Sequence, residues 1–242
     1  MALTAIVSYD GTANENDALA LGSLLAHAGA DVHIGYVRHS EELVGDEEAN
    51  ELLERGKRLF DGPLAGAHTV TDPSTPAGLS SLAQQIGAQA IVFCSDSHTA
   101  PGHVTIGNSA EQLIEGGPVA VGIAPVGLYA GDGVSTKVER IVAVGEAGGD
   151  GGAQRTAEAF AQALGAQVVP VADEQADLLV IDSRPDAPRG QVSLSSSAEH
   201  LIEIATCPVL ALPSGVELSL GGANGANGVS DVGPAAPVGS AA

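Results

Sequence analysis

VTIGNSAEQLIE, at residues 104–115, and VSLSSSAEHLIE, at residues 192–203, are two versions of one segment. Seven of the twelve positions are identical, in parts of the chain that have no low-complexity bias. One difference is that Gly107 in the first version stands opposite Ser195 in the second. A repeated segment of this length indicates an internal duplication.

The duplication extends beyond this segment, but its two copies differ in length. Gly29 matches Gly165 at an offset of 136 residues, whereas Ser109 matches Ser197 at an offset of 88 residues. The second copy is therefore shorter by 48 residues, and the loss falls within residues 171–176.

Apolar residues in the first copy follow two periods in alternation. Short apolar runs predict buried strands at residues 5–9, 32–37, 67–71, 90–94 and 119–124. Apolar stripes at helical spacing lie between them, which gives the order β-α-β-α-β-α-β-α-β. This order predicts an α/β fold, an open parallel sheet with helices on both faces.

The second copy repeats the pattern with one strand and two helices fewer. Its predicted strands are residues 141–144, 168–171, 178–181 and 208–212. The second of these contains Pro170, which cannot donate a hydrogen bond to a neighbouring strand and is therefore typical of a sheet edge. Because the third strand is missing, we expect this strand to be an edge strand.

Composition and charge restrict the partners of the chain. Its 242 residues include 30 Asp and Glu against 9 Lys and Arg, which gives a net charge of -21. Such a surface repels nucleic-acid phosphates and anionic lipids, so we expect neither nucleic acid nor a membrane as partner. Two cysteines are too few for a disulfide framework, and the N-terminus has no basic region before an apolar run. These features predict a cytoplasmic protein.

The repeats also predict the domain boundaries. Residues 1–126 form a complete domain, residues 127–138 a linker, and residues 139–213 a truncated second domain. Residues 214–242 lack a periodic apolar pattern, so we expect a disordered tail whose deletion leaves the melting temperature nearly unchanged.

Several segments resemble the universal stress protein family: AIVSYDGT at residues 5–12, DALALGSLLAHAGADV at 17–32, and GNSAEQLIE and PVAVGIAP within 107–125. SSSAEHLIEIATCPVLALP at residues 195–213 repeats the match in the second copy. The resemblance implies a tandem, Rossmann-like stress-response protein. It also implies the strand order 3-2-1-4-5 in the first domain and a shortened sheet in the second.

Many members of that family bind ATP beyond the ends of strands 1 and 4, where the strand order reverses. They use Gly, two residues, Gly, nine residues, Gly, and Ser or Thr, because glycines let the backbone approach phosphates. By spacing, this pattern falls on Cys94, Ser97, Gly107 and Asn108, so one glycine of three is retained. The implied binding residues are Tyr9, Asp10, Gly11, Val37, Ser95, Gly107, Asn108 and Ser109.

The resemblance implies a role for two of these residues. Asp10 would contact the ribose or adenine, and Val37 would line the adenine pocket. No metal is expected beyond a magnesium ion that accompanies the nucleotide. The alternative is that these residues are structural remnants, in which Gly107 gives a tight turn and Asn108 or Ser109 caps the following helix.

The second copy departs further from the family pattern. The same positions are Asp182, Pro185, Ser195 and Ser196, so that no glycine remains and a carboxylate stands beside the phosphate loop. Gly145 is interpreted as the replacement of the aspartate of strand 1. We expect the second domain to be degenerate as a nucleotide site and to serve for docking.

Weaker patterns have simpler explanations. Asp96, His98 and His103 could hold a metal on one loop, but surface histidines are the ordinary alternative. The CxxS form at residues 94–97 could be a redox motif, although a core cysteine is more usual there, and Cys207 is expected to be buried. Pro118 follows Glu111 by seven positions, against nine from Glu199 to Pro208, which predicts a shorter helix or a pinched exit in the first copy.

The sequence thus predicts a regulatory protein that is not an enzyme, with an adenine-nucleotide site in the first domain. Its alternative is a ligand-free interaction protein in which both sites have decayed. A slow nucleotide hydrolase is disfavoured because we expect no catalytic lysine or arginine near either loop. The domains should pair across their strand-5 edges as an intramolecular pseudo-dimer, and the same edge would serve a homodimer.

Overall fold

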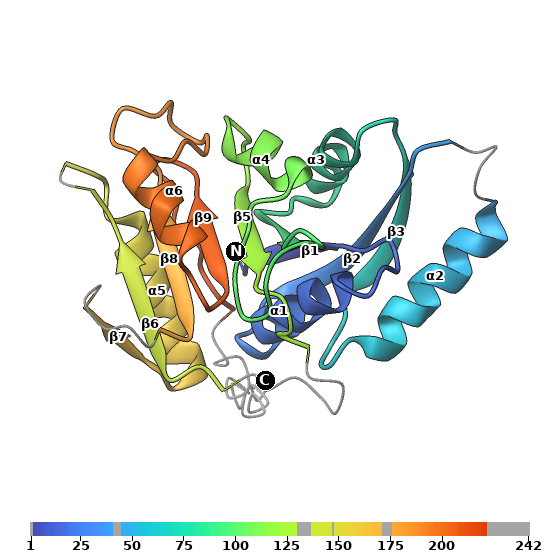
Figure 1. Ribbon diagram of the computed structural model, residues 1–242, viewed down its shortest axis with the longest axis horizontal. Coiled ribbons are helices and arrows are strands. Elements are labelled where there is room, and N and C mark those ends of the chain that lie inside the picture. The colour runs from blue at the N-terminus through green and yellow to red at the C-terminus, as the bar shows by residue number, and fades with distance from the viewer. Residues whose placement is uncertain (1, 41–44, 130–136, 147, 171–175, 222–242) are drawn as a thin grey trace, which may run out of the picture.

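The computed structural model describes residues 2–40, 45–129, 137–146, 148–170 and 176–221. Within these residues nine strands form one sheet in the order β3-β2-β1-β4-β5-β9-β8-β6-β7 (Figure 1). The predicted α/β class and the order 3-2-1-4-5 in the first five strands are confirmed.

The first half of the chain, in its described residues, forms five strands of this sheet and four helices. They are β1 (Thr4–Ser8), α1 (Glu15–His27), β2 (Asp31–Arg38), α2 (Asp46–Leu59), β3 (Gly66–Thr71), α3 (Thr75–Ile86), β4 (Ala90–Cys94), α4 (Asn108–Ile114) and β5 (Ala120–Ala124).

The second half, in its described residues, has one strand and two helices fewer, as the sequence predicts. Its elements are β6 (Arg140–Val144), α5 (Gly152–Leu164), β7 (Gln167–Val169), β8 (Leu178–Asp182), α6 (Ser196–Glu203) and β9 (Val209–Leu212). The counterparts of β3, α2 and α3 are the missing elements. Residues 171–175, where the sequence places the loss, lie outside the described part of the chain.

β5 and β9, the last strands of the two halves, join them into one sheet. They pair antiparallel, with Val121 opposite Ala211 and Ile123 opposite Val209. The other seven strand pairings are parallel. This is the contact between strand-5 edges that the sequence predicts, formed within one chain.

Two apolar cores lie on opposite faces of this sheet. In β1, Ala5 and Val7 belong to the core under α1, α2 and α5, whereas Ile6 belongs to the core under α3, α4 and α6. The alternation follows from the two-residue period of a strand. Figure 1 shows α3, α4 and α6 together on the upper side of the sheet. Among the described helices, none combines the length and apolar character that a bilayer crossing requires.

β7 is an edge of the sheet, as Pro170 indicates. The strand ends at Val169, however, so Pro170 lies directly after it and not within it. A proline at this point prevents the strand from continuing with regular pairing.

The duplicated helices α4 and α6 differ by one residue in length, seven against eight. The exit of α4 is also pinched, because the Gly117 N–H donates to the Leu113 carbonyl at 2.7 Å. A Cβ on residue 117 would lie 2.4 Å from that oxygen, so only glycine fits. The shorter spacing to Pro118 thus reflects both a shorter helix and a close turn.

Residues 214–221, here called the C-terminal strap, are ordered against both halves. Leu218 is 1% exposed, and its N–H donates to Thr156 Oγ1 in α5 at 3.0 Å. The Leu3 N–H donates to the Ser219 carbonyl at 2.7 Å. The expectation of disorder from residue 214 is therefore wrong for the strap, while residues 222–242 lie outside the described chain.

Candidate functional site

A cavity of about 590 Å³ lies beyond the carboxyl ends of β1 and β4, where the strand order reverses. The β1–α1 loop, the end of β4 and the first turn of α4 contribute most of its lining, and Thr75 of α3 adds to it. The loops that leave β1 and β4 diverge at this point, because the helices that follow them, α1 and α4, pack on opposite faces of the sheet. The cavity therefore arises from the topology.

Five of the eight predicted binding residues line this cavity: Asp10, Ser95, Gly107, Asn108 and Ser109. The Ser95 hydroxyl donates to the Ala124 carbonyl at 2.7 Å. Ser95 Oγ also accepts the Thr105 N–H at 3.1 Å, so that the side chain is held in place. Ser95 therefore ties the end of β4 to β5 and to the loop that leads to α4.

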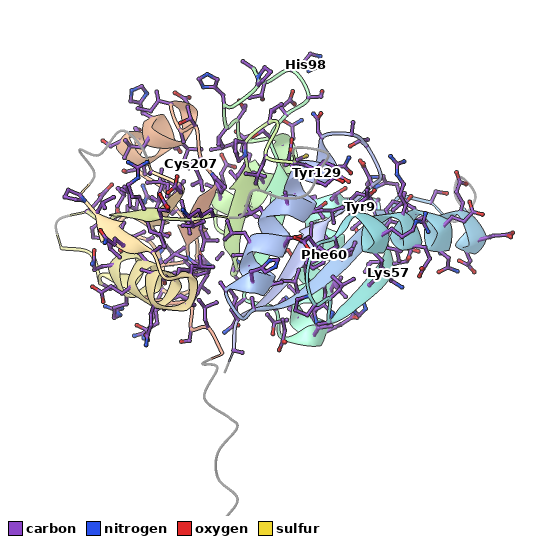
Figure 2. The ribbon with its side chains drawn as sticks, turned by 90° about the horizontal axis from the view of Figure 1, so that it is seen from below. Tyr9, Lys57, Phe60, His98, Tyr129 and Cys207 are labelled. Atoms are coloured by element: carbon purple, nitrogen blue, oxygen red, sulfur yellow. The ribbon has the colours of Figure 1, made fainter. Side chains whose placement is uncertain are left out.

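Tyr9, Gly11 and Val37 are not in the lining. Tyr9 is 1% exposed and lies in the interior of the first half (Figure 2), against Gly56 of α2. Val37 packs against Gly78 of α3. Gly11 lines a second groove, along α2, and Asp10 lines both this groove and the cavity. Alternate residues at the end of a strand face opposite sides of the sheet, and the sequence pattern does not reveal which side each ligand-facing residue takes.

The start of α4 differs from both structural explanations that the sequence offered. Its N-cap is Gly107, with extended backbone at φ -78° and ψ 160°, and no side chain caps the helix. Asn108 and Ser109 are already within the helix, and Gly107 makes no tight turn. The alternative of a side-chain cap at Asn108 or Ser109 is therefore wrong.

The duplicate helix shows what the glycine changes. Ser195 caps α6 with nearly the same backbone, φ -84° and ψ 160°, and its hydroxyl accepts the Ala198 N–H at 3.3 Å. The conformation at Gly107 thus does not require glycine, and a Cβ there would meet nothing within 4 Å. Because residue 107 has no side chain, no described group covers the first turn of α4 on the side of the cavity.

Glu15, which the sequence analysis did not single out, also lines the cavity and is 9% exposed. It accepts the backbone N–H of Asp10 in a short hydrogen bond. Burial, and then the charge of Asp10, raise the pKa of Glu15 to about 9. Glu15 is therefore neutral near pH 7, and the cavity carries one negative charge less than its composition indicates.

Other titratable groups in the lining are acidic or neutral. Hydrogen bonds from His98 lower the pKa of Asp96. Burial, together with Glu15 and Asp10, raises the pKa of Cys94 to about 12, which disfavours the thiolate that a redox motif needs. Cys207 is 7% exposed, as expected for a core cysteine. None of the described lining residues is lysine or arginine.

The three residues considered as metal ligands do not form a site. His98 Nδ1 lies 3.1 Å from Asp96 Oδ1, but its side chain is 94% exposed at the tip of the loop (Figure 2). In the described part of the chain, no group of three His, Cys, Asp or Glu side chains could hold a metal ion.

Strand register corrects one correspondence in the second half. Ala5 pairs with Ala90, and Ile141 pairs with Leu178, so the offset between β1 and β6 is 136 residues. The counterpart of Asp10 is therefore Glu146, and Gly145 corresponds to Tyr9. The interpretation of Gly145 as the replacement of the aspartate is wrong by one residue.

Asp182 fills the switch point of the second half. Its Oδ1 accepts the Ala153 N–H, in the first turn of α5, at 2.5 Å. Its Oδ2 is buried without a hydrogen-bond partner among the described residues and would lie 3.2 Å from a Cβ on residue 145. Gly145 thus leaves room for Asp182, and the carboxylate occupies the helix start where a ligand anion would bind.

Asp182→Asn is expected to raise the free energy of unfolding at pH 7 by about 1–3 kcal/mol. Burial raises the pKa of Asp182 from 3.8 to about 6, so the folded state holds this proton to a higher pH than the unfolded chain does. The resulting stability is complete below pH 3.8 and is lost as the pH rises through about 6. Urea titrations at several pH values should show that the free energy of unfolding declines less with rising pH in the variant than in the wild type. Asp61→Asn, at an exposed position, is the control, and an equal change in both variants would contradict the assignment.

Comparison with known proteins supports the fold. No family model matches the chain, and no curated protein matches its sequence. Among solved structures, a universal stress protein from Archaeoglobus fulgidus DSM 4304 aligns with a TM-score of 0.59 and 13% identity, over 87% of this chain and 98% of its own. A functionally unknown protein from Pseudomonas aeruginosa PAO1 aligns with a TM-score of 0.56 and 15% identity, over 87% of this chain and 92% of its own. The chain therefore has the fold of the universal stress proteins.

Proposed function

We propose that this chain is a tandem universal-stress-type regulator whose first half binds an adenine nucleotide. The observation that carries the proposal is the cavity at the β1–β4 switch point, which five of the eight predicted binding residues line. Ligands of open parallel sheets bind at this position. A volume of about 590 Å³ suits a nucleotide-sized molecule.

The polar groups of the lining favour particular parts of a nucleotide. Asp10 has carboxylate oxygens that can accept hydrogen bonds from ribose hydroxyls. Ser97, Asn108 and Ser109 supply hydroxyl and amide donors near the uncovered start of α4. Because the lining offers no basic side chain among its described residues, the phosphates would depend on these donors and on a magnesium ion that arrives with the nucleotide.

The second half has another part in this proposal. A nucleotide phosphate there would need backbone N–H groups at the helix starts. Those of Ala153 and Ala198 already donate to the side chains of Asp182 and Ser195. β9 instead pairs with β5 and so completes the sheet of the first half. The second half therefore acts as a docking half within an intramolecular pair, and the chain regulates without catalysing a reaction, in the cytoplasm.

A ligand-free interaction protein is the second candidate. It is favoured by the acidic lining, in which Asp10 and Asp96 accompany Glu15 without a described lysine or arginine. If this candidate is correct, the purified protein releases no nucleotide when it is denatured, and calorimetry detects no ATP binding at millimolar concentration.

Gly107→Ser is expected to weaken ATP binding by about tenfold or more, which corresponds to the loss of one hydrogen bond to a charged group. The new hydroxyl should cap the Ala110 N–H, as Ser195 caps Ala198, and occupy space in the cavity. The fold should tolerate it, because Ser195 has the same backbone conformation and exchange of serine and glycine at an N-cap changes stability by only a few tenths of a kcal/mol. Isothermal titration calorimetry measures the affinity.

Ser195→Gly is the matched control for this variant. It uncovers the start of α6, but Asp182 still fills the second switch point, so no second ATP site should appear. Unchanged ATP affinity in Gly107→Ser, or weaker binding in Ser195→Gly alone, would contradict the proposed position of the nucleotide.

A further inference from the structure

Three of the nine Lys and Arg residues of this acidic chain surround one cavity in the second half. The cavity has a volume of about 360 Å³, and Arg155, Arg184 and Arg189 are in its lining. They come from two segments: Arg155 from the first turn of α5, and Arg184 and Arg189 from the start and the middle of the loop after β8. The sequence analysis expected no catalytic lysine or arginine near either loop, and it did not single out these three arginines.

This cavity overlaps the duplicated counterpart of the first-half cavity, because residues 148–150 and 183–185 of its lining correspond to residues 12–14 and 95–97. It differs from that counterpart in two ways. The start of α6, which the Ser195 side chain caps, is not in its lining, and the cavity extends instead to Arg155, Arg189 and the beginning of the strap. In the first half, Asp17 accepts the Gly127 and Tyr129 N–H groups at 2.9 and 2.7 Å and so ties the exit of β5 to α1.

Asp150 organises the walls of the cavity. Its carboxylate accepts the Gly152 N–H at 2.8 Å and the Gly215 N–H in a short hydrogen bond. Its carbonyl accepts from Arg155 Nη1 at 2.7 Å. Asp150 thereby ties the start of α5 to the exit of β9, and its carboxylate oxygens are engaged by backbone donors.

The three arginines differ in how firmly they are held. Arg155 pairs with Glu217 of the strap, which fixes its position. Arg184 lies 3.4 Å from Asp186, but both side chains are substantially exposed, at 47% and 78%, so this ion pair is weak. Arg189 lies over Gly215, and the described residues contain no acidic partner for it.

Together they place three guanidinium groups in the lining of a small cavity. Guanidinium groups form paired, charge-assisted hydrogen bonds with phosphate oxygens. Arg155 Nε and Nη1 already donate to Glu217 and to the Asp150 carbonyl, so Arg184 and Arg189 would supply most of the donors to a bound phosphate. The backbone of Gly148, Gly149 and Gly215 in the lining allows close approach. We propose that this cavity binds the phosphate group of a small molecule or free inorganic phosphate.

The test uses the full chain and two phosphate probes, orthophosphate and ribose 5-phosphate, with succinate as a carboxylate of similar charge. Binding is followed by calorimetry and by the NMR resonances of the arginine Nε–H groups. We expect one phosphate per chain, with shifts in the resonances of Arg184 and Arg189 and none with succinate at the same concentration. Tighter binding of ribose 5-phosphate identifies a phosphate ester as ligand, and equal binding identifies free phosphate.

Arg189→Gln and Arg184→Gln should each weaken phosphate binding by about tenfold or more, the loss expected for charge-assisted hydrogen bonds. Both side chains are exposed, so the melting temperature should remain that of the wild type. Arg58→Gln, which removes one positive charge from α2, is the control and should change the affinity by less than about twofold. Gly107→Ser should also leave phosphate binding intact, which separates this site from the nucleotide cavity. No binding at millimolar phosphate, or equal weakening by Arg58→Gln, would overturn the proposal.

Discussion

Leu218→Ala is expected to lower the free energy of unfolding by about 2–5 kcal/mol, the range for removal of a buried leucine side chain. Leu218 is 1% exposed and belongs to the core that α1, α2 and α5 cover, which includes side chains from both halves. Since the strap also hydrogen-bonds to Thr156 in α5 and to Leu3 before β1, its loosening weakens the contact between the halves. Urea denaturation followed by circular dichroism measures the loss.

Two truncations test the strap as a whole. A chain of residues 1–221 keeps the strap and should retain the melting temperature of the full protein, since the remaining segment lacks an apolar pattern. A chain of residues 1–213 loses the strap and should melt several degrees lower. Equal melting temperatures for these two chains would show that Leu218 contributes little and that the strap is not a structural element.

The sequence contained a signal for the strap that helical periodicity does not detect. Val216, Leu218 and Leu220 alternate with polar residues, and all three pack on the same core. Such alternation is typical of an extended segment with one buried face. The segment is short and follows a glycine, and its partners lie more than 60 positions away, at Thr156 and near the N-terminus. A pattern within the segment cannot identify partners at that distance.

The order of strands and the place of the cavity could be predicted, because duplication, periodicity and family resemblance all bear on topology. Which residues face the cavity could not be predicted as well. Tyr9 and Val37 adjoin the right strand ends, but they pack under α2 and α3. The missing segment of the second half explains two linked changes. Tyr9 packs against α2, and the second half has no counterpart of α2 in its described residues, so Gly145 stands at the position of Tyr9. Asp182 then lies in the space that a side chain at residue 145 would need.

The charge of the cavity at the β1–β4 switch point could not be predicted from composition for a similar reason. A count of carboxyl groups assigns Glu15 a negative charge. Its protonation depends on burial at the start of α1 and on the proximity of Asp10, which follow only from the folded arrangement. Likewise, the chain has few basic residues, and the position of three of them around one cavity depends on how α5, the loop after β8 and the strap meet in the folded chain.

Glu15→Gln is expected to raise the free energy of unfolding at pH 7 and above. It should also remove most of the decline in this free energy that Glu15 causes as the pH rises. The pKa of Glu15 is raised from 4.5 to about 9 in the folded state. The folded state therefore binds more protons than the unfolded chain between these values, and stability declines as the pH rises. The decline from one such group approaches about 1.4 kcal/mol per pH unit. Glutamine resembles the neutral carboxyl group, so it can accept the Asp10 N–H without this dependence.

The same substitution separates the proposed function from a purely structural role of Glu15. In the wild type, ionisation of Glu15 near pH 9 adds a negative charge to the cavity and should weaken ATP binding as the pH rises. In Glu15→Gln, the affinity should remain level over that range, and denaturant titrations should show a flatter stability profile than the wild type from pH 6 to 9. Glu47→Gln, at an exposed position on α2, is the control and should follow the wild type in both measurements. If the stability profile flattens but ATP affinity still falls in Glu15→Gln, Glu15 is buried and protonated as described, but the nucleotide does not bind in this cavity.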